Sequence, residues 1–375
     1  MKEELVLHIG AHKTGTTTIQ RALALYREQL SKKNVHFATT GDHNNVHQSL
    51  GPVEYQKLIP KGFRVYKIDD LVQNLTNHDM DRVIASSENF SFFFAEDSIN
   101  RLAQRINPFF NKVTILTYLR RQDAHAVSHY QEGAKPDRLA EEQLYGYRPT
   151  PLPMRSNVLD FYLDYNQRIG MWADVFGEEN IIVRPFERDQ LEGSDIWLDF
   201  LKTLSIEPEG MIDHPLLNAS MGKSRTFLGH IMNEMGLPSS TKQILLDLTE
   251  EDKKYLPCRR DAEAFYSPYK ESNQKLNERL RVNGTYGIFS ERFEEYPESE
   301  VNLWTEKSVE QLTRTLVQFI ANMRDNNSYT AKISELEHER DVACKQRDHA
   351  RRHPWKYFGY ALKSRKKKLA GPRRF

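Results

Sequence analysis

Residues 5–17 read LVLHIGAHKTGTT, and this stretch decides the fold. Its first part, 5–9, is a short apolar run that ends at a glycine, as a buried strand does. From the run of threonines onward, apolar side chains recur at steps of three and four, at Ile19, Leu23, Tyr26 and Leu30. That periodicity predicts a helix that begins at Thr16. The sequence therefore predicts a strand, a glycine-rich loop and a helix in direct succession.

The loop between this strand and this helix has the composition of an anion-binding loop. Gly10 and Gly15 have the spacing of the two glycines in a nucleotide-binding P-loop, whose backbone N–H groups and helix dipole face a phosphate. That P-loop requires a lysine directly after its second glycine, but Thr16 stands there and the loop's lysine is Lys13. We therefore expect phosphate binding in a manner that differs from a kinase or nucleoside triphosphatase.

Further strand candidates follow along the chain, and helical patterns separate them. The strand candidates are 82–87 (RVIASS), 112–119 (KVTILTYL) and 180–184 (NIIVR). Helical spacing of apolar residues covers 158–176 and, near the end of the chain, 305–323. Strands that alternate with helices imply crossover connections and parallel pairing. We expect an α/β fold in three layers, a parallel β-sheet flanked by helices, with a mostly helical C-terminal part.

A second anion-binding pattern follows the strand candidate at 112–119. Arg120 comes directly after that strand, and Ser128 lies eight residues later in the next predicted helix. An arginine offers a phosphate charge and a fork of donors, and a serine adds a hydroxyl donor. Arg121 is adjacent, so the spacing alone leaves open which arginine faces the anion.

Together the two motifs resemble those of the sulfotransferases that use 3′-phosphoadenosine-5′-phosphosulfate (PAPS). The resemblance is specific over residues 1–132 and more diffuse up to residue 300, where IIVRPFERDQL and WLDFLKTLSI are similar to a bacterial branch of the family. It implies a fold like that of the P-loop nucleoside triphosphate hydrolases. It also implies PAPS as co-substrate, adenosine 3′,5′-bisphosphate as product, and no metal.

The resemblance also assigns roles to individual residues. It implies that Lys13 contacts the oxygen that bridges phosphate and sulfate, and that Arg120 and Ser128 hold the 3′-phosphate. The residues implied to bind PAPS are His12, Lys13, Thr14, Gly15, Thr16, Thr17, Arg120 and Ser128. The chain departs from the family at 121–122, where Arg-Gln replaces the common Asn-Pro.

Transfer to a hydroxyl requires a group that takes its proton, and a carboxylate or a histidine is the usual one. Glu88 follows the strand candidate at 82–87, and the carboxyl ends of parallel strands face the ligand crevice. His47, in the polar segment GDHNNVHQSL, is the second candidate. The predicted catalytic residues are therefore Lys13, Glu88 and His47, and the choice of base between the last two stays open.

Composition narrows the class of partner. The chain has 375 residues and a formal net charge of +1, yet residues 351–375 hold ten Lys or Arg and no acidic residue. The other 350 residues therefore carry −9, so we expect no nucleic-acid partner. Cys258 and Cys344 lie far apart, and no spacing is typical of a disulfide framework or a zinc site.

We expect two regions, a sulfotransferase domain at 1–326 and, at 327–375, a charged helical segment with a basic, aromatic tail. Neither a signal-peptide core nor an 18-residue apolar run is visible, which favours a cytoplasmic protein. Two roles remain open for the tail. It either contacts the anionic inner face of the membrane or only keeps the chain in solution.

No motif identifies the acceptor, for which we expect a hydroxyl or amine on a carbohydrate or glycolipid, with a bacterial surface glycan as one candidate. Two other functions compete with sulfuryl transfer. A small-molecule kinase would have a lysine directly after Gly15 and a carboxylate for Mg²⁺. A non-catalytic nucleotide-binding protein would have lost loop residues, whereas Lys13, Arg120 and Ser128 are all present.

Overall fold

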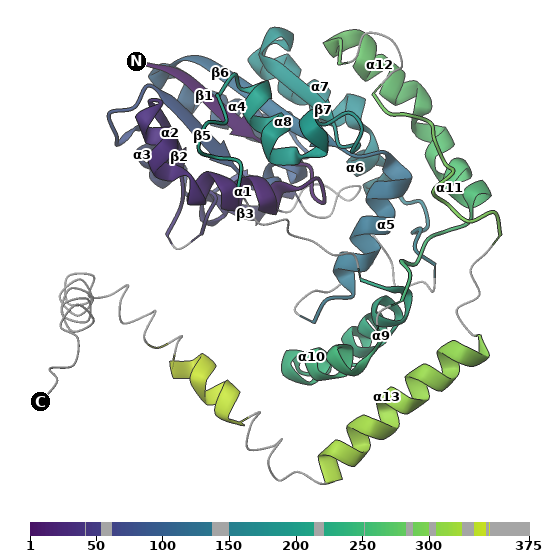
Figure 1. The fold of residues 1–375 in the computed structure, drawn as a ribbon. Coiled ribbons are helices and arrows are strands. Elements are labelled where there is room, and N and C mark those ends of the chain that lie inside the picture. Colours follow the sequence, from purple (N-terminus) through teal and green to yellow (C-terminus); the bar gives the residue numbers. More distant parts are fainter. Residues whose placement is uncertain are drawn as a thin grey trace, which may run out of the picture. The chain divides into compact units, whose positions relative to one another are not determined.

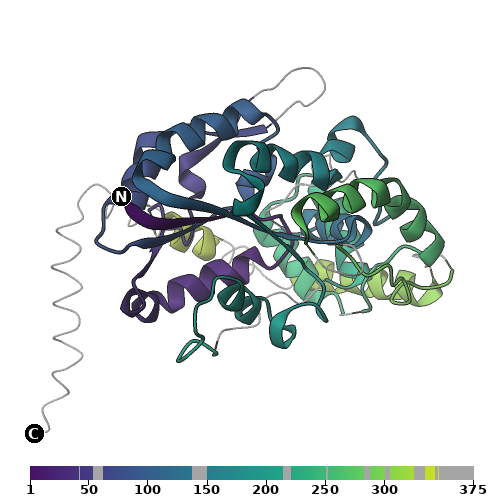
Figure 2. The same ribbon diagram turned by 90° about the horizontal axis from the view of Figure 1, so that it is seen from above.

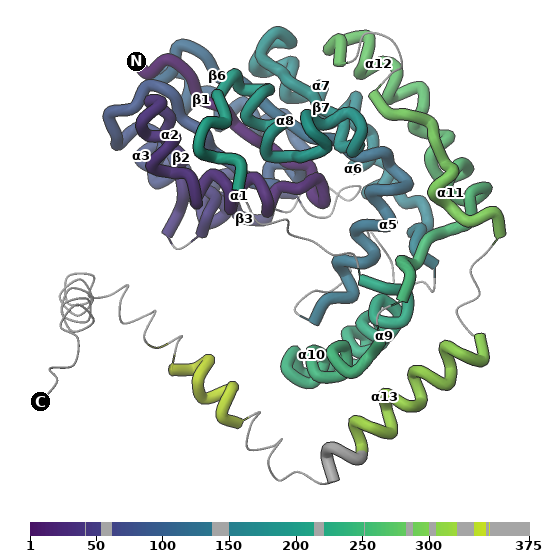
Figure 3. Tube along the Cα trace, viewed as in Figure 1, coloured from purple at the N-terminus to yellow at the C-terminus, as the bar shows by residue number. Residues whose placement is uncertain are grey.

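The computed structural model describes residues 1–41, 43–53, 62–136, 150–213, 221–250, 252–282, 288–299, 305–324, 334–342 and 345. The chain divides into two compact units, Met1–Gly236 with Glu251–Leu303, and Leu237–Glu250 with Trp304–Phe375. All predicted site residues lie in the first unit, and Figure 3 traces the order of its elements. The predicted boundary at residue 326 stays a prediction, and the basic tail at 351–375 lies outside the described residues.

The first unit is built on a five-stranded sheet of order β2-β5-β1-β6-β7, in which every pair is parallel (Figure 1). Its strands are β1 (Lys2–His8), β2 (Val35–Ala38), β5 (Arg82–Ser86), β6 (Phe110–Leu119) and β7 (Ile181–Pro185). A separate antiparallel pair consists of β3 (Leu50–Val53) and β4 (Gly62–Val65). The predicted parallel sheet is therefore confirmed.

Strand β1 lies inside the sheet and is buried on both faces. Leu5 and Leu7 belong to one hydrophobic core, and Val6 belongs to the other. Because successive side chains of a strand point to opposite faces, a strand between two helical layers must be apolar at consecutive positions. The run at 5–9 has this property, and Figure 2 shows helices on both sides of the sheet.

The helices divide between the two faces. The core around Val6 includes α1 (Thr16–Leu25), α2 (Arg27–Lys32) and α8 (Ile196–Thr203). The core around Leu5 and Leu7 includes α3 (Ile68–Thr76), α4 (Glu96–Ile106), α6 (Asn157–Leu163), α7 (Tyr165–Phe176), α11 (Arg259–Tyr266) and α12 (Lys270–Leu280). The unit also contains α5 (Gln122–Gly133) and α9 (Lys223–Glu234).

Two predicted helices are interrupted. The helix expected at 158–176 is divided into α6 and α7 at Asp164, whose carboxylate accepts the N–H of Gln167 at 2.9 Å and caps α7. An acidic side chain that bonds the next turn favours a new helix start over continuation. The helix that begins at Thr16 ends at Leu25, and α2 follows after Tyr26.

The second unit contains α10 (Ser239–Leu248) and α13 (Glu306–Arg324), which pack on each other. The helix predicted at 305–323 is therefore observed with a shift of one residue. Its buried side chains include Ser308 and Thr315, whereas Leu316 is exposed. Within the described part of the chain, no helix combines the length and apolar content that crossing a bilayer requires.

Candidate active site

Three of the predicted segments leave the sheet on the side where its parallel strands have their carboxyl ends. His8, the last residue of β1, is level with Ser86 of β5 and with Leu116 of β6. The glycine loop, Glu88 and Arg120 therefore all follow the carboxyl ends of neighbouring parallel strands. Ligands of open α/β sheets bind at this edge.

The glycine loop has a backbone that requires glycine at both of its ends. Gly10 has φ of 96°, and a Cβ there would lie 2.7 Å from the hydroxyl of Ser91. Gly15 has φ of 79° and is the N-cap of α1. Between them, the Thr14 hydroxyl donates to the carbonyl of Ala11 at 2.7 Å and closes the loop. The backbone of the loop therefore leads directly into the first turn of α1.

The start of α1 leaves backbone donors available. Thr16 is buried and Thr17 is exposed at the first turn. Within the residues described, no side chain forms a capping hydrogen bond at this end. The first N–H groups of a helix have no partner within the helix, and together with the helix dipole they favour an anion.

The ammonium of Lys13 forms an ion pair inside the protein. Its Nζ lies 2.7 Å from Oε2 of Glu132, on α5, and the same oxygen lies 2.7 Å from Nζ of Lys135. Burial lowers the pKa of Lys13, and Glu132 partly offsets that effect. An anion bound in the loop would therefore compete with Glu132 for the charge of Lys13.

Arg120 lies beside the loop. Its Nη1 donates to the carbonyl of Lys13 at 3.3 Å, and its guanidinium carbon lies 5.7 Å from the ring centroid of Phe186. Burial lowers the pKa of Arg120. Among the described residues, no carboxylate lies within ion-pair distance of Arg120. Ser128, 9% exposed, lies on α5 one turn before Glu132.

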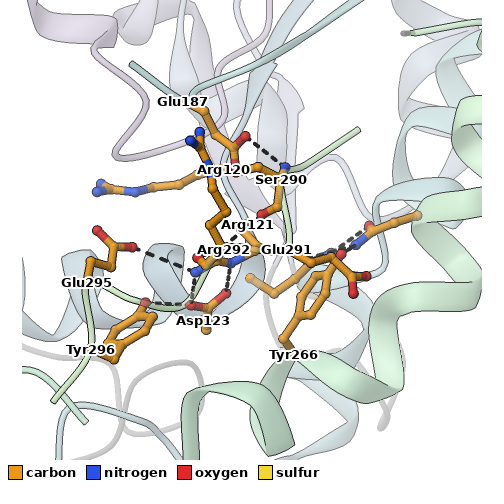
Figure 4. Close-up of polar contacts among 12 residues, drawn as sticks. Arg120, Arg121, Asp123, Glu187, Tyr266, Ser290, Glu291, Arg292, Glu295 and Tyr296 are labelled. Carbon is orange, nitrogen blue, oxygen red and sulfur yellow. Dashed lines mark hydrogen bonds and ion pairs between the residues drawn. The ribbon is translucent and has the colours of Figure 1, made fainter. Parts of the chain in front are cut away.

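Arg121, unlike Arg120, is paired with a carboxylate (Figure 4). Its guanidinium is paired with both carboxylate oxygens of Asp123, at 2.8 and 3.0 Å, and both side chains are almost fully buried. It also donates to the carbonyls of Ser290 and Arg292, at 2.9 and 2.6 Å, and lies 3.9 Å from the ring centroid of Phe293. Arg121 therefore fastens the 290–296 segment to the start of α5 and has little capacity left for a ligand.

The two candidate bases are in contact with each other. His47 Nε2 lies 3.3 Å from Oε1 of Glu88, and His47 Nδ1 lies 2.5 Å from the hydroxyl of Ser87. Because the Ser87 oxygen accepts the N–H of Asn89 at 3.2 Å, its hydroxyl can donate to Nδ1. The proton of a neutral His47 ring then lies on Nε2, facing Glu88. Gln20 donates to the other oxygen of Glu88 at 2.9 Å.

Glu88 is held as a carboxylate. Burial alone raises its pKa, but the hydrogen bond and charge of His47, with a further contribution from His12, hold the pKa well below its usual range. Burial lowers the pKa of His12 to about 4. His12 Nδ1 is hydrogen-bonded to the hydroxyl of Tyr162 at 3.0 Å, and its ring centroid lies 4.5 Å from that of Phe92.

The structure thus brings Lys13 beside Arg120, and Glu88 beside His47. Sequence reasoning does not assign roles to Gln20 and Glu132, which contact Glu88 and Lys13. Helical spacing gives a weak indication of both residues, because Gln20 lies one turn after Thr16 on α1 and Glu132 lies one turn after Ser128 on α5. In the part of the chain that is described, no group of three acidic, cysteine or histidine side chains is placed to hold a metal.

Comparisons with known proteins assign no activity to this chain. No protein-family model matches it. A protein of Archaeoglobus fulgidus, described as uncharacterized, is 26% identical over 196 residues, which span 50% of this chain and 51% of that protein. A crystal structure of a sulfotransferase from Alicyclobacillus acidocaldarius aligns with a TM-score of 0.42 and 15% identity, over 76% of this chain and 98% of that chain.

The different surroundings of the two arginines predict different mutant phenotypes. Arg121→Met should lower the free energy of unfolding by about 3–5 kcal/mol, because it leaves the Asp123 carboxylate buried without its cation. Arg120→Met is the matched control and should change it by no more than about 1 kcal/mol. Urea denaturation at pH 7 measures both, and equal losses would contradict the assignment.

Proposed function

We propose that this protein transfers the sulfuryl group of PAPS to a hydroxyl or amine of an acceptor. The observation that carries the proposal is the hydrogen bond from Arg120 to the carbonyl of Lys13. It sets a cation beside a glycine loop that already suits a 5′-phosphate. PAPS differs from common nucleotides in its additional 3′-phosphate, and Arg120 with Ser128 offers a charge and a hydroxyl for that group.

Lys13 supplies the charge that the reaction needs. As the bond from sulfur to the bridging oxygen breaks, negative charge develops on that oxygen, and a preformed cation stabilises it. In this mechanism, Lys13 exchanges its contact with Glu132 for the leaving oxygen. The neighbouring Lys135 retains Glu132 as its partner, so the carboxylate keeps one cation when Lys13 turns away.

Glu88 accepts the proton of the acceptor as the new sulfur–oxygen bond forms. Its depressed pKa and its two donors, Gln20 and His47, support a carboxylate of fixed orientation. The contacts of His47 support a positioning role, because Nδ1 accepts from Ser87 and the Nε2 proton faces Glu88. The neutral ring then has no lone pair left for a substrate proton, whereas each carboxylate oxygen of Glu88 keeps one. This favours Glu88 over His47 as the base.

The acceptor is proposed to be a carbohydrate or glycolipid, with a bacterial surface glycan as one candidate. Phe92 supports an acceptor that carries a ring, because it is partly exposed beside His12, whereas Phe93 and Phe94 are buried in the core. An aromatic face of this kind can pack against the apolar side of a ring. The basic tail is proposed to contact an anionic membrane.

The wild-type protein should bind adenosine 3′,5′-bisphosphate more tightly than adenosine 5′-phosphate, and Arg120→Met and Ser128→Ala should remove most of that difference. The physical reason is that both side chains address only the 3′-phosphate. Calorimetric titration with the two ligands, and with ATP and Mg²⁺, measures it. Tighter binding of MgATP would favour a kinase, and no nucleotide binding at all would reject the proposal.

Lys13→Ala should lower turnover about 10²–10³-fold, the loss typical of a preorganised charge at a leaving group. Release of adenosine 3′,5′-bisphosphate from PAPS, with a panel of glycan acceptors, is the measurement. Lys135→Ala is the control, because it removes the other lysine paired with Glu132 and should change turnover only a few-fold. Similar losses in both variants would exclude a special role for Lys13.

Glu88→Gln should lower turnover about 10²–10⁴-fold while it preserves PAPS affinity, because an amide keeps the size but cannot accept a proton. Since the pKa of Glu88 lies below its usual range, the wild-type rate should stay flat down to about pH 5. Loss of most of the turnover in His47→Ala, with turnover retained in Glu88→Gln, would instead point to His47 as the base. His47→Ala, measured in parallel, separates the two cases.

A further inference from the structure

Arg168, on α7, is a buried arginine that lacks an anionic partner in the described part of the chain. Its side chain is 2% exposed, and its Nη1 donates to the carbonyl of Ser91 at 3.1 Å. Its Nε and Nη2 are also buried, and neither forms a hydrogen bond with a described residue. Arg121 shows the contrasting case, because Asp123 and two carbonyls satisfy its guanidinium.

The surroundings of Arg168 are unfavourable for the stability of the fold. A buried charge without a counter-charge destabilises a folded protein, and so does a buried donor without an acceptor. Natural proteins tolerate such local conflicts mainly at functional sites. Arg168 therefore needs an explanation other than stabilisation of the core.

Two contacts of Arg168 lead to the glycine loop. Ser91, which accepts from the guanidinium, donates from its hydroxyl to the carbonyl of Ile9 at 2.8 Å, directly before the loop. The guanidinium carbon also lies 4.7 Å from the ring centroid of Tyr162, whose hydroxyl is hydrogen-bonded to Nδ1 of His12 at 3.0 Å. On each path, a single residue separates Arg168 from the loop or from the residue that precedes it.

A third contact leads to Arg120. The guanidinium carbon of Arg168 lies 5.4 Å from the ring centroid of Tyr165, and the Tyr165 hydroxyl donates to the carbonyl of Arg120 at 2.7 Å. Ser91 itself belongs to the helical turn 88–92, which begins at Glu88. Arg168 is therefore connected to all three segments that follow the carboxyl ends of β1, β5 and β6.

We propose that Arg168 is a positioning residue of the candidate site, which holds the glycine loop and Arg120 in place for an anion. Because it is buried, it acts through Ser91, Tyr162 and Tyr165 and does not touch the ligand. Its positive charge favours the anion as well, since charges interact more strongly in a protein interior than in water. The inference rests on the proposed function only for the identity of the ligand.

Arg168→Met separates this role from a purely structural one. Methionine fills a similar space without a charge, so the midpoint of urea denaturation should stay the same or rise. The affinities for adenosine 3′,5′-bisphosphate and adenosine 5′-phosphate should both fall about 10-fold, because both ligands use the glycine loop. Calorimetric titration measures them. A lower midpoint with unchanged affinities would indicate a structural arginine and overturn the proposal.

Two further variants control this experiment. Gln167→Met is the matched control, because its side chain is exposed and adjacent on α7, and both affinities should be retained. Arg168→Lys keeps the charge and should retain most of the affinity even if Arg168→Met proves unstable. Equal losses of affinity in Arg168→Lys and Gln167→Met would show that any change on this helix weakens binding, and would contradict the proposal.

Variants of the two tyrosines test the separate paths. Tyr162→Phe removes the hydroxyl bonded to His12 and should weaken both nucleotides to a similar extent. Tyr165→Phe removes the hydroxyl at the Arg120 carbonyl and should mainly reduce the preference for the bisphosphate, because Arg120 addresses the 3′-phosphate in the proposed function. Wild-type affinities in both variants would contradict positioning through these side chains.

Inorganic pyrophosphate, which requires only the glycine loop, separates this inference from the proposed function. If Arg168→Met weakens pyrophosphate binding but the wild-type protein does not prefer the bisphosphate, the inference stands and the proposed function fails. If Arg168→Met binds all three ligands as tightly as the wild type, the inference fails and the proposed function stands. A wild-type protein that binds none of the three would reject both.

Discussion

Strand β1 is hydrogen-bonded to β5 on one side and to β6 on the other, and this pairing positions the glycine loop, Glu88 and Arg120. The register sets the last residue of β1 level with the last residue of β5 and with Leu116, three residues before the end of β6. The glycine loop, Glu88 and Arg120 therefore all follow the carboxyl ends of neighbouring strands. A slip of one residue would turn Leu5 and Leu7 toward the wrong helical layer. Burial on both faces therefore fixes the geometry of the site as well as the stability of the sheet.

The sequence predicts those parts of the fold where local pattern and tertiary burial agree. Strands β1, β5 and β6 each contain a run that is buried at consecutive positions, as two covered faces require. Strand β7, at the edge of the sheet, alternates buried and half-buried positions. The short edge strand β2 (VHFA) is less evident, because four residues with a central histidine give little periodic signal. The division at Asp164 is missed for a different reason, since the apolar spacing continues across it and only the side-chain cap creates the break.

The sequence predicts the candidate site only where a local pattern is sufficient. Its loop and its strand-end residues follow from local motifs, but contacts between distant residues do not. The pair of His47 and Glu88 spans 41 positions. The choice between Arg120 and Arg121 depends on Asp123 and on carbonyls at 290 and 292, whose proximity only the folded chain reveals. One arginine is neutralised by the protein, and its neighbour is left with a net charge that a ligand can use.

The carboxylate of Glu132 pairs with Lys13, so the lysine of the glycine loop already has an anionic partner within the protein. In the proposed function, a phosphate at the loop replaces Glu132 as the partner of Lys13, so the contribution of Lys13 to binding is the difference between two attractions. Dissolved salt screens both attractions, so the difference responds weakly to ionic strength. Arg120 has no such internal partner in the described part of the chain, and attraction of a phosphate to it is screened in full. The two ends of one nucleotide would therefore be held with unequal sensitivity to salt.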